Sequence, residues 1–136
     1  MNNPQYVHKW IPKDIAYYMH LDNPSVVKKL QNRFKDKAII YGIRCQVDNM
    51  LYIGSTLTPS LRFHKHLVLG SRSNASLQAA IAKHGIARFT VHIFEIVDLP
   101  LQVSYQKRKS LLVKVEQQYI DSVPKRKLYN SINASS

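Results

Sequence analysis

The sequence predicts one α+β domain in which a three-stranded antiparallel sheet is flanked by helices, with a helical extension at the N-terminus. The chain has 136 residues, of which 45% are hydrophobic, so it suits one hydrophobic core better than two. Two runs of strand-forming residues flank a turn, and a third run alternates apolar and polar side chains. Helix-start residues precede three other segments, and a fourth long helix is expected near the C-terminus, so strands and helices mix along the chain as in an α+β fold.

The first 36 residues are expected to form a basic extension that precedes a main domain at residues 37–136. Residues 1–23 suggest an irregular arm with one short helical piece around Pro12–Met19. Asn23-Pro24 is typical of a helix start, because Asn caps the first turn and Pro fits within it. A basic helix is expected from there to about Phe34.

Residues 38–45 and 50–54 predict a β-hairpin, since β-branched and aromatic residues flank the turn-forming pair Asp48-Asn49. A loop of four residues would place Ile43 opposite Tyr52. Tyr41 and Tyr52 would then lie on the same face of the hairpin, one diagonal step apart.

Start and stop residues and one alternating run define the rest of the fold. The expected elements are a helix from Thr58-Pro59 to Gly70, a helix from Asn74 to Gly85, a strand at Phe89–Val97 and a helix from Leu101 to about Ser122.

The charge balance indicates a polyanionic partner. Lys and Arg number 20 against 8 Asp and Glu, which gives a formal net charge of +12 and favours nucleic acid. The alternative explanation of this charge is that the chain is a small basic protein whose surface charge only keeps it soluble. No stretch approaches the roughly 20 apolar residues that span a bilayer, and residues 1–13 lack the apolar core of a signal peptide. The single cysteine, Cys45, excludes an intrachain disulfide and Cys-rich zinc patterns, and favours a reducing compartment.

Three features fit a purely structural interpretation poorly. Glu116 falls inside the apolar arc of the last helix, where a carboxylate is rare unless it is paired or binds a metal; an ordinary ion pair with Lys or Arg is the alternative. Arg62 and His66, four residues apart, share one helix stripe at the edge of the buried face, although exposed basic pairs are common. Tyr41 and Tyr52 share a strand face, where core packing is the ordinary explanation.

These residues also stand at a fixed spacing. Tyr52 follows Tyr41 by eleven positions, Arg62 follows Tyr52 by ten, and His66 follows Arg62 by four. With this spacing, Ile39-Ile40-Tyr41 and Leu51-Tyr52-Ile53-Gly54-Ser55 resemble the two motifs of the GIY-YIG nuclease family. Three later segments are similar to the family's helix and third strand, its glutamate motif and its closing Tyr-Asn motif: residues 74–89, Val115–Ile120 and Leu128-Tyr129-Asn130. The resemblance covers about residues 37–131, and Ile39 stands where the family usually has Gly.

The resemblance implies a divalent-metal-dependent DNA endonuclease, closest in style to intron-encoded homing endonucleases. The chain contains two glutamates, Glu95 and Glu116, which are too few for a two-metal carboxylate cluster. One Mg²⁺ (or Mn²⁺) ion at Glu116 is therefore expected, with no small-molecule cofactor. The implied roles are water activation by Tyr41 or Tyr52, a phosphate grip by Arg62, proton transfer or phosphate binding by His66, and orientation by Asn130.

DNA is the expected partner, held through its phosphates, and a membrane is not expected. The basic residues expected to contact the backbone are Lys28, Lys29, Arg33, Lys35, Lys65, Arg72, Lys107, Arg108 and Lys109. Two alternatives stay open: a structure-directed repair or recombination nuclease, and a non-catalytic nucleic-acid-binding protein of ribosomal type. An intron-encoded member would act in an organelle, a mitochondrion or a plastid; otherwise an intracellular protein is expected.

Overall fold

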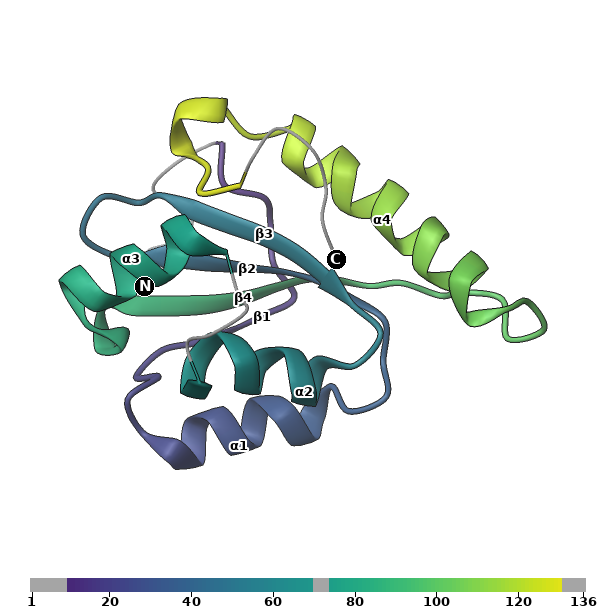
Figure 1. The fold of residues 1–136 in the computed structure, drawn as a ribbon, viewed down its shortest axis with the longest axis horizontal. Coiled ribbons are helices and arrows are strands. Elements are labelled where there is room, and N and C mark those ends of the chain that lie inside the picture. Colours follow the sequence, from purple (N-terminus) through teal and green to yellow (C-terminus); the bar gives the residue numbers. More distant parts are fainter. Residues whose placement is uncertain (1–9, 70–73, 131–136) are drawn as a thin grey trace.

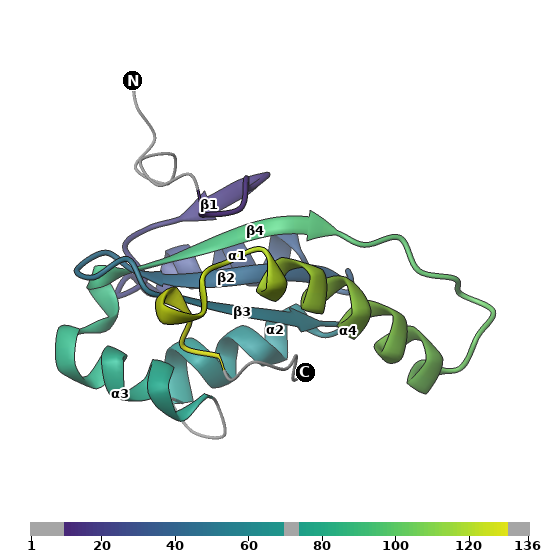
Figure 2. The same cartoon turned by 90° about the horizontal axis from the view of Figure 1, so that it is seen from above.

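Four antiparallel strands form the centre of the computed structural model, which describes residues 10–69 and 74–130 (Figure 1). The strands lie side by side in the order β1-β4-β2-β3, with β1 and β3 at the two edges (Figure 2). Their bounds are Ala16–Tyr18 for β1, Ile39–Cys45 for β2, Leu51–Thr56 for β3 and Phe89–Ile96 for β4. The α+β class is confirmed, but the sheet has four strands rather than the three expected.

The fourth strand corrects the expectation of a short helix at Pro12–Met19. Ala16–Tyr18 pairs with β4 in antiparallel register, with Tyr17 opposite His92, and the Ile15 N–H donates to the Ile93 carbonyl at 2.8 Å. The edge of β4 offers the backbone N–H and C=O groups of this segment hydrogen-bond partners. A single helical turn in isolation would leave most of these groups without partners inside the chain. Between residues 10 and 36 the extension therefore contains one helix, α1, and residues 16–18 belong to the sheet.

The hairpin forms with the expected register. Ile43 lies opposite Tyr52 and Tyr41 opposite Gly54, and the Cys45 N–H donates to the Met50 carbonyl at 2.9 Å. Side chains alternate between the two faces of a sheet. The co-facial placement of Tyr41 and Tyr52 is thus confirmed.

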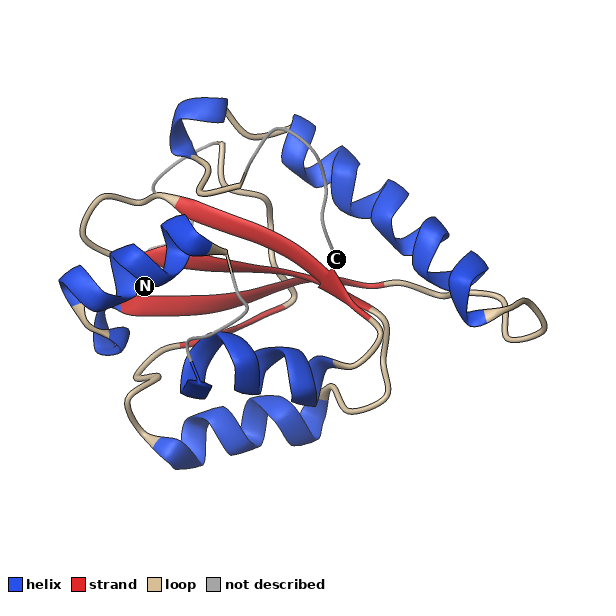
Figure 3. Cartoon of the chain, in the orientation of Figure 1, coloured by secondary structure: helices blue, strands red, loops and turns tan. Residues whose placement is uncertain are grey.

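Helices cover both faces of the sheet (Figure 3). The caps expected at Asn23 and Asn74 are present, and their side chains accept from the N–H groups of Ser25 and Leu77 at 3.0 and 2.9 Å. The described elements are α1 (Pro24–Arg33), α2 (Pro59–Phe63), the π-helix η2 (His64–Leu69), α3 (Ala75–His84), the short turn η3 (Ile86–Arg88), α4 (Tyr105–Asp121) and the short turn η4 (Lys125–Lys127). Within these ranges, no helix is long and apolar enough to cross a membrane.

Two helix bounds differ from expectation. The last helix begins at Tyr105 rather than Leu101, because the Ser104 hydroxyl caps it by accepting from the Lys107 N–H at 3.1 Å, and the preceding apolar residues lie in an exposed loop. The helix that begins after Thr58 changes to a π-helix at His64. Its expected end, Gly70, lies outside the described residues.

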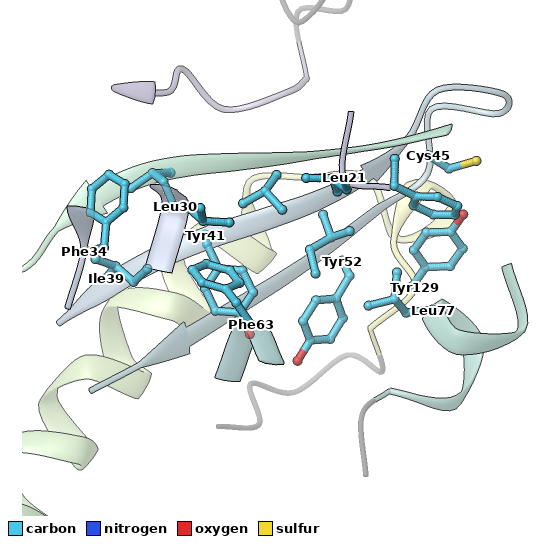
Figure 4. Close-up of a cluster of buried hydrophobic side chains, with 14 residues drawn as sticks. Leu21, Leu30, Phe34, Ile39, Tyr41, Cys45, Tyr52, Phe63, Leu77 and Tyr129 are labelled. Carbon is cyan, nitrogen blue, oxygen red and sulfur yellow. The ribbon is translucent and has the colours of Figure 1, made fainter. Parts of the chain in front are cut away.

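The core divides into two layers, one on each face of the sheet. One layer contains Tyr41 and Tyr52 with side chains of α1, α2 and α3, and Figure 4 shows these two tyrosines together with Phe63 of α2. The other layer packs α4 against Ile40 and Ile53. The two faces of the β2–β3 hairpin therefore meet different helices, and the candidate site draws residues from both.

Candidate active site

Two buried phenols define the first part of the site. Tyr41 and Tyr52 are 0% and 1% exposed, and their ring centroids lie 6.3 Å apart. Gly54 explains how the Tyr41 ring fits, because a Cβ atom at this position would lie 2.6 Å from the Tyr41 hydroxyl oxygen. The absence of a side chain at Gly54 therefore lets the Tyr41 phenol lie directly across β3.

Arg62 and His66 bring a cation and an imidazole to these phenols. The Nη2 of Arg62 donates to the Tyr52 hydroxyl at 3.4 Å, and the Nε2 of His66 lies 2.7 Å from the Tyr41 hydroxyl. The His66 ring also meets the Tyr52 ring edge-on, at 5.2 Å between centroids. Four residues singled out from the sequence thus gather on one face of the sheet.

The electrostatics of this group fix which members carry charge. Burial, with the neighbouring Tyr52, raises the pKa of Tyr41 well above its ordinary value, and this outweighs the lowering effect of Arg62. Burial, together with the positive charge of Arg62, lowers the pKa of His66 to about 3. The pKa of Arg62 itself is raised, because its phenol neighbours offset the burial. At neutral pH the site therefore holds a guanidinium, a neutral phenol and a neutral imidazole.

Arg62 has a further donor. Its Nε is buried and, among the described residues, has no hydrogen-bond acceptor. A buried donor without an acceptor is costly, so such groups commonly have a functional explanation. An anion such as a phosphate oxygen would satisfy this N–H.

Glu116 lies on α4, against the opposite face of the sheet. It is fully buried, as its place in the apolar arc predicted, and the Ser55 hydroxyl donates a hydrogen bond to its carboxylate. Ser55 follows Gly54 directly, so its side chain points away from the tyrosine face. The negative charge of Glu116 nevertheless contributes to raising the pKa of Tyr41, which places the carboxylate within electrostatic reach of the phenol.

Asn130 completes the group at the outer edge of β3. Its side-chain oxygen accepts from the Ile53 N–H at 2.8 Å, and its side-chain nitrogen donates to the Ile53 carbonyl at 2.6 Å. The Tyr129 N–H also donates to the Leu51 carbonyl at 2.9 Å. Asn130 therefore substitutes for a neighbouring strand and fixes the backbone between the two motif residues Tyr52 and Gly54.

Two residues of the site, Gly54 and Ser55, were not predicted from the sequence to have a role there. Both belong to the second motif, but neither was predicted to support a functional side chain. Alternation along β3 provides the signal for Ser55, since a residue next to Gly54 must face the helix that carries Glu116. For Gly54 the signal is the motif itself, whose glycine matches a close approach of Tyr41.

The expected DNA-contacting residues are distributed over three places. One exposed group lies on or just after α1 and consists of Lys28, Lys29 and Lys35. A second exposed group lies on α4 and consists of Lys107 and Lys109. Two of the expected residues are partly buried, namely Lys65 and Arg108. Arg33 is exposed but already makes contacts within the chain, since it donates to the Tyr18 hydroxyl at 3.3 Å and lies over the Phe34 ring. Arg72 lies outside the described residues.

These features define a class of protein: a small α+β domain in which two phenols, an imidazole and an arginine gather on one face of a β-hairpin, with a buried carboxylate on the other face. The comparisons with known proteins agree. The model of the GIY-YIG catalytic domain matches residues 37–130, and the chain belongs to the GIY-YIG family. It is a nuclease domain, as the resemblance implied.

One relative and one solved structure support this assignment. A protein of Neurospora crassa, named probable intron-encoded endonuclease 1, is 32% identical over 119 residues; the match covers 88% of this chain and 38% of the relative. The catalytic domain of intron endonuclease I-TevI, solved as a glutamate-to-alanine mutant, is 27% identical with a TM-score of 0.57. That match covers 73% of this chain and 97% of the solved one.

GIY-YIG nucleases generally depend on a divalent metal ion. The buried carboxylate of Glu116 and the Ser55 hydroxyl are oxygen ligands, the class that Mg²⁺ and Mn²⁺ prefer. A hydrated ion needs few ligands from the protein, so a site with one carboxylate is sufficient.

Proposed function

We propose that this domain hydrolyses phosphodiester bonds of DNA with the help of one Mg²⁺ or Mn²⁺ ion held at Glu116. The observation that carries the proposal is the hydrogen bond of 2.7 Å between the Tyr41 hydroxyl and Nε2 of His66, formed beside Arg62. This bond joins a group that can exchange a proton with water to a neutral imidazole that can accept one. The family assignment and the intron-encoded relative support the same reaction.

Arg62 is proposed to bind the scissile phosphate. Its Nη2 already positions the Tyr52 hydroxyl, whereas its Nε has no acceptor among the described residues. A guanidinium offers a planar set of donors that matches two phosphate oxygens. The phosphate would therefore lie next to both phenols, with its negative charge partly neutralised.

Tyr41 and His66 are proposed to move the proton of the attacking water. The pKa of Tyr41 is raised, so the phenol is protonated and can donate to His66 while its oxygen accepts from water. The pKa of His66 is lowered to about 3, partly by Arg62, and a bound phosphate would offset that positive charge. Substrate binding is thus expected to strengthen His66 as the proton acceptor. Tyr52, held by Arg62, is proposed to orient the water.

Glu116 and Ser55 are proposed to hold the divalent ion, and Asn130 to keep β3 in place between the two halves of the site. When bound, such an ion stabilises the charge that develops on the phosphate and on the leaving oxygen. The same carboxylate also lies within electrostatic reach of Tyr41. No small-molecule cofactor has a role in this scheme.

DNA is proposed to bind through the exposed basic side chains of α1 and α4. Lys28, Lys29 and Lys35 belong to one group, and Lys107 and Lys109 to another. Contacts of this kind weaken steeply with salt, by a slope of about 0.9 for each phosphate that is neutralised. Residues 1–36 are proposed to add to this binding beyond their part in the fold, with residues 37–136 as the nuclease domain.

The biological role proposed is that of a homing-type endonuclease, by analogy with the intron-encoded relative. This chain spans about 38% of the length of that relative. An organellar location is proposed on the same ground.

The test is cleavage of supercoiled plasmid with and without Mg²⁺ or Mn²⁺. Glu116→Gln should lower the rate at least a hundredfold, whereas the matched control Glu95→Gln should stay within about threefold of the unmodified chain. Glu95 suits this comparison because it is the other glutamate, is partly buried, and accepts from the Tyr119 hydroxyl at 2.8 Å away from the site. Equal activity of the two variants would contradict the metal role of Glu116.

The same assay separates the two alternatives that the sequence left open. A branched duplex cut at least tenfold faster than a linear one would favour a structure-directed nuclease over the homing type. Absence of cleavage with either ion, combined with retained DNA binding, would favour a non-catalytic nucleic-acid-binding protein.

A further inference from the structure

Three metal-ligating side chains meet at the far end of the β2–β3 hairpin. Cys45 is the last residue of β2, Asp48 lies in the turn, and His84 is the last residue of α3. Their ligand atoms all lie within 4.8 Å of one another, and no other set of three Cys, His, Asp or Glu side chains in the described ranges is this close. None of the three takes part in the nuclease site.

The backbone holds each of the three side chains in place. The Asn49 N–H donates to the Cys45 carbonyl at 2.9 Å, which closes the turn around Asp48. The Asp48 carboxylate accepts from the Met50 N–H at 3.0 Å. His84 ends its helix at Gly85, which has the positive φ of 87° that favours glycine. The cluster thus joins two residues of the hairpin, Cys45 and Asp48, to His84 at the end of α3, which is distant in the sequence.

The donor set identifies the kind of ion. A thiolate, an imidazole and a carboxylate are the ligands that Zn²⁺ takes in proteins, whereas Mg²⁺ takes oxygen ligands and does not select a thiolate. Tetrahedral zinc with bonds of about 2.0–2.3 Å places its ligand atoms about 3.5 Å apart. Asp48 is exposed and His84 is partly exposed, so their side chains can turn inward by the remaining ångström, and an ion can enter from that side.

Tyr129 adds a fourth polar group. Its ring lies beside Cys45 in the core (Figure 4), and its hydroxyl lies 3.5 Å from the Asp48 carboxylate. This hydroxyl donates a hydrogen bond to the Asp48 carboxylate. Donors of this kind orient metal ligands, and the fourth position on the ion is left for water.

We propose that Cys45, Asp48 and His84 form a binding site for Zn²⁺ that ties the β2–β3 hairpin to the end of α3. This site is separate from the ion proposed at Glu116. Cys45 lies opposite Met50, five residues along β3 from the Ser55 that binds Glu116, which is about 17 Å at 3.4 Å per residue. The inference does not depend on nuclease activity.

The test uses metal-free full-length chain titrated with Zn²⁺ or Co²⁺. Co²⁺ should give a thiolate charge-transfer band that saturates at one ion per chain. This band can report only Cys45, because the chain has one cysteine, and an ion at Glu116 would not contribute to it. At a free Zn²⁺ concentration about a hundred times its Kd, the melting temperature should rise by about 10 °C. Mg²⁺ at the same concentration should produce no such rise.

Two variants test where the ion binds and leave the buried Cys45 side chain in place. Asp48→Asn keeps an acceptor for the Met50 N–H, and His84→Gln keeps a helix-forming residue; both should lose the zinc-induced rise in melting temperature. His64→Gln, which replaces an exposed imidazole on η2, and Glu116→Gln should both keep it. The proposal would be overturned by no charge-transfer band, by one ion per two chains, or by an unchanged zinc response in Asp48→Asn and His84→Gln.

Discussion

The hydrogen bond between Tyr41 and His66 can be tested by removing one oxygen atom. Tyr41→Phe deletes the hydroxyl and keeps the ring, which packs against Phe63 at 5.0 Å between centroids. Phenylalanine has no hydroxyl, so the variant removes this hydrogen bond to His66, while its ring fills the same buried space as the tyrosine ring. The variant therefore changes one polar contact and leaves the packing of the tyrosine layer intact.

The magnitude follows from the burial of both partners. Losing one partner of a buried hydrogen bond costs about 1–3 kcal/mol in the free energy of unfolding. For a chain of this length, 1 kcal/mol corresponds to about 4 °C in melting temperature, so a decrease of about 4–12 °C is expected. Positioned proton transfer contributes about 10²–10⁴-fold to a rate, so plasmid cleavage by Tyr41→Phe should slow by at least a hundredfold.

The assay pairs urea unfolding with cleavage at saturating Mg²⁺, and Tyr119→Phe is the matched control. Tyr119 donates to Glu95 at 2.8 Å outside the site, so its variant should lose some stability but keep the cleavage rate within about threefold. A double-mutant cycle with His66→Gln should give a coupling energy of about 1 kcal/mol or more in stability. The proton-transfer role would be refuted if Tyr41→Phe cleaved DNA at the rate of the Tyr119→Phe control.

Two further predictions concern the same layer. Gly54→Ala would place a Cβ atom 2.6 Å from the Tyr41 hydroxyl oxygen, so we expect a loss of about 1–3 kcal/mol in urea unfolding together with slower cleavage; a variant as stable and as active as the unmodified chain would contradict this close approach. The lowered pKa of His66 predicts that the folded protein becomes less stable in acid. In the unfolded chain this residue binds a proton below about pH 6.5. In the folded chain it does so only near pH 3. Stability should therefore fall as the pH drops through this window, by up to about 1.4 kcal/mol per pH unit, with His92 contributing in the same direction because burial lowers its pKa too. His66→Gln should flatten the profile measured by urea unfolding against pH, whereas His64→Gln should not; equal slopes would mean that the His66 imidazole is not buried in its neutral form.

Local patterns in the sequence were sufficient to predict the hairpin and most helix starts. Strand alternation depends on neighbouring residues, so the co-facial placement of Tyr41 and Tyr52 could be inferred before any tertiary contact was known. The cap at Asn74 is equally local, since its side chain accepts from an N–H three residues later. The inward position of Glu116 followed from helical periodicity alone.

Features that depend on distant partners could not be predicted in this way. Ala16–Tyr18 forms a strand because β4 offers it an edge, and its partners lie about 75 residues away in the sequence. Leu101 belongs to an apolar run that continues the pattern of α4, yet it is 84% exposed because the helix begins only at the Ser104 cap. The hydrogen bond from Ser55 to Glu116 likewise requires α4 to be docked on the sheet.

The π-helix η2 explains why two residues of one predicted stripe have different surroundings. In a continuous α-helix, Arg62 and His66 would project side by side from the edge of the buried face. The wider turn begins at His64, between them, and such π segments frequently occur at functional sites. His66 is consequently 1% exposed with its Nε2 on the Tyr41 hydroxyl, whereas Arg62 is partly exposed and reaches Tyr52 from the rim. One irregular turn thus leaves the Arg62 guanidinium partly exposed and buries the His66 imidazole, and in the proposed mechanism this change in helix type would separate phosphate binding from proton transfer.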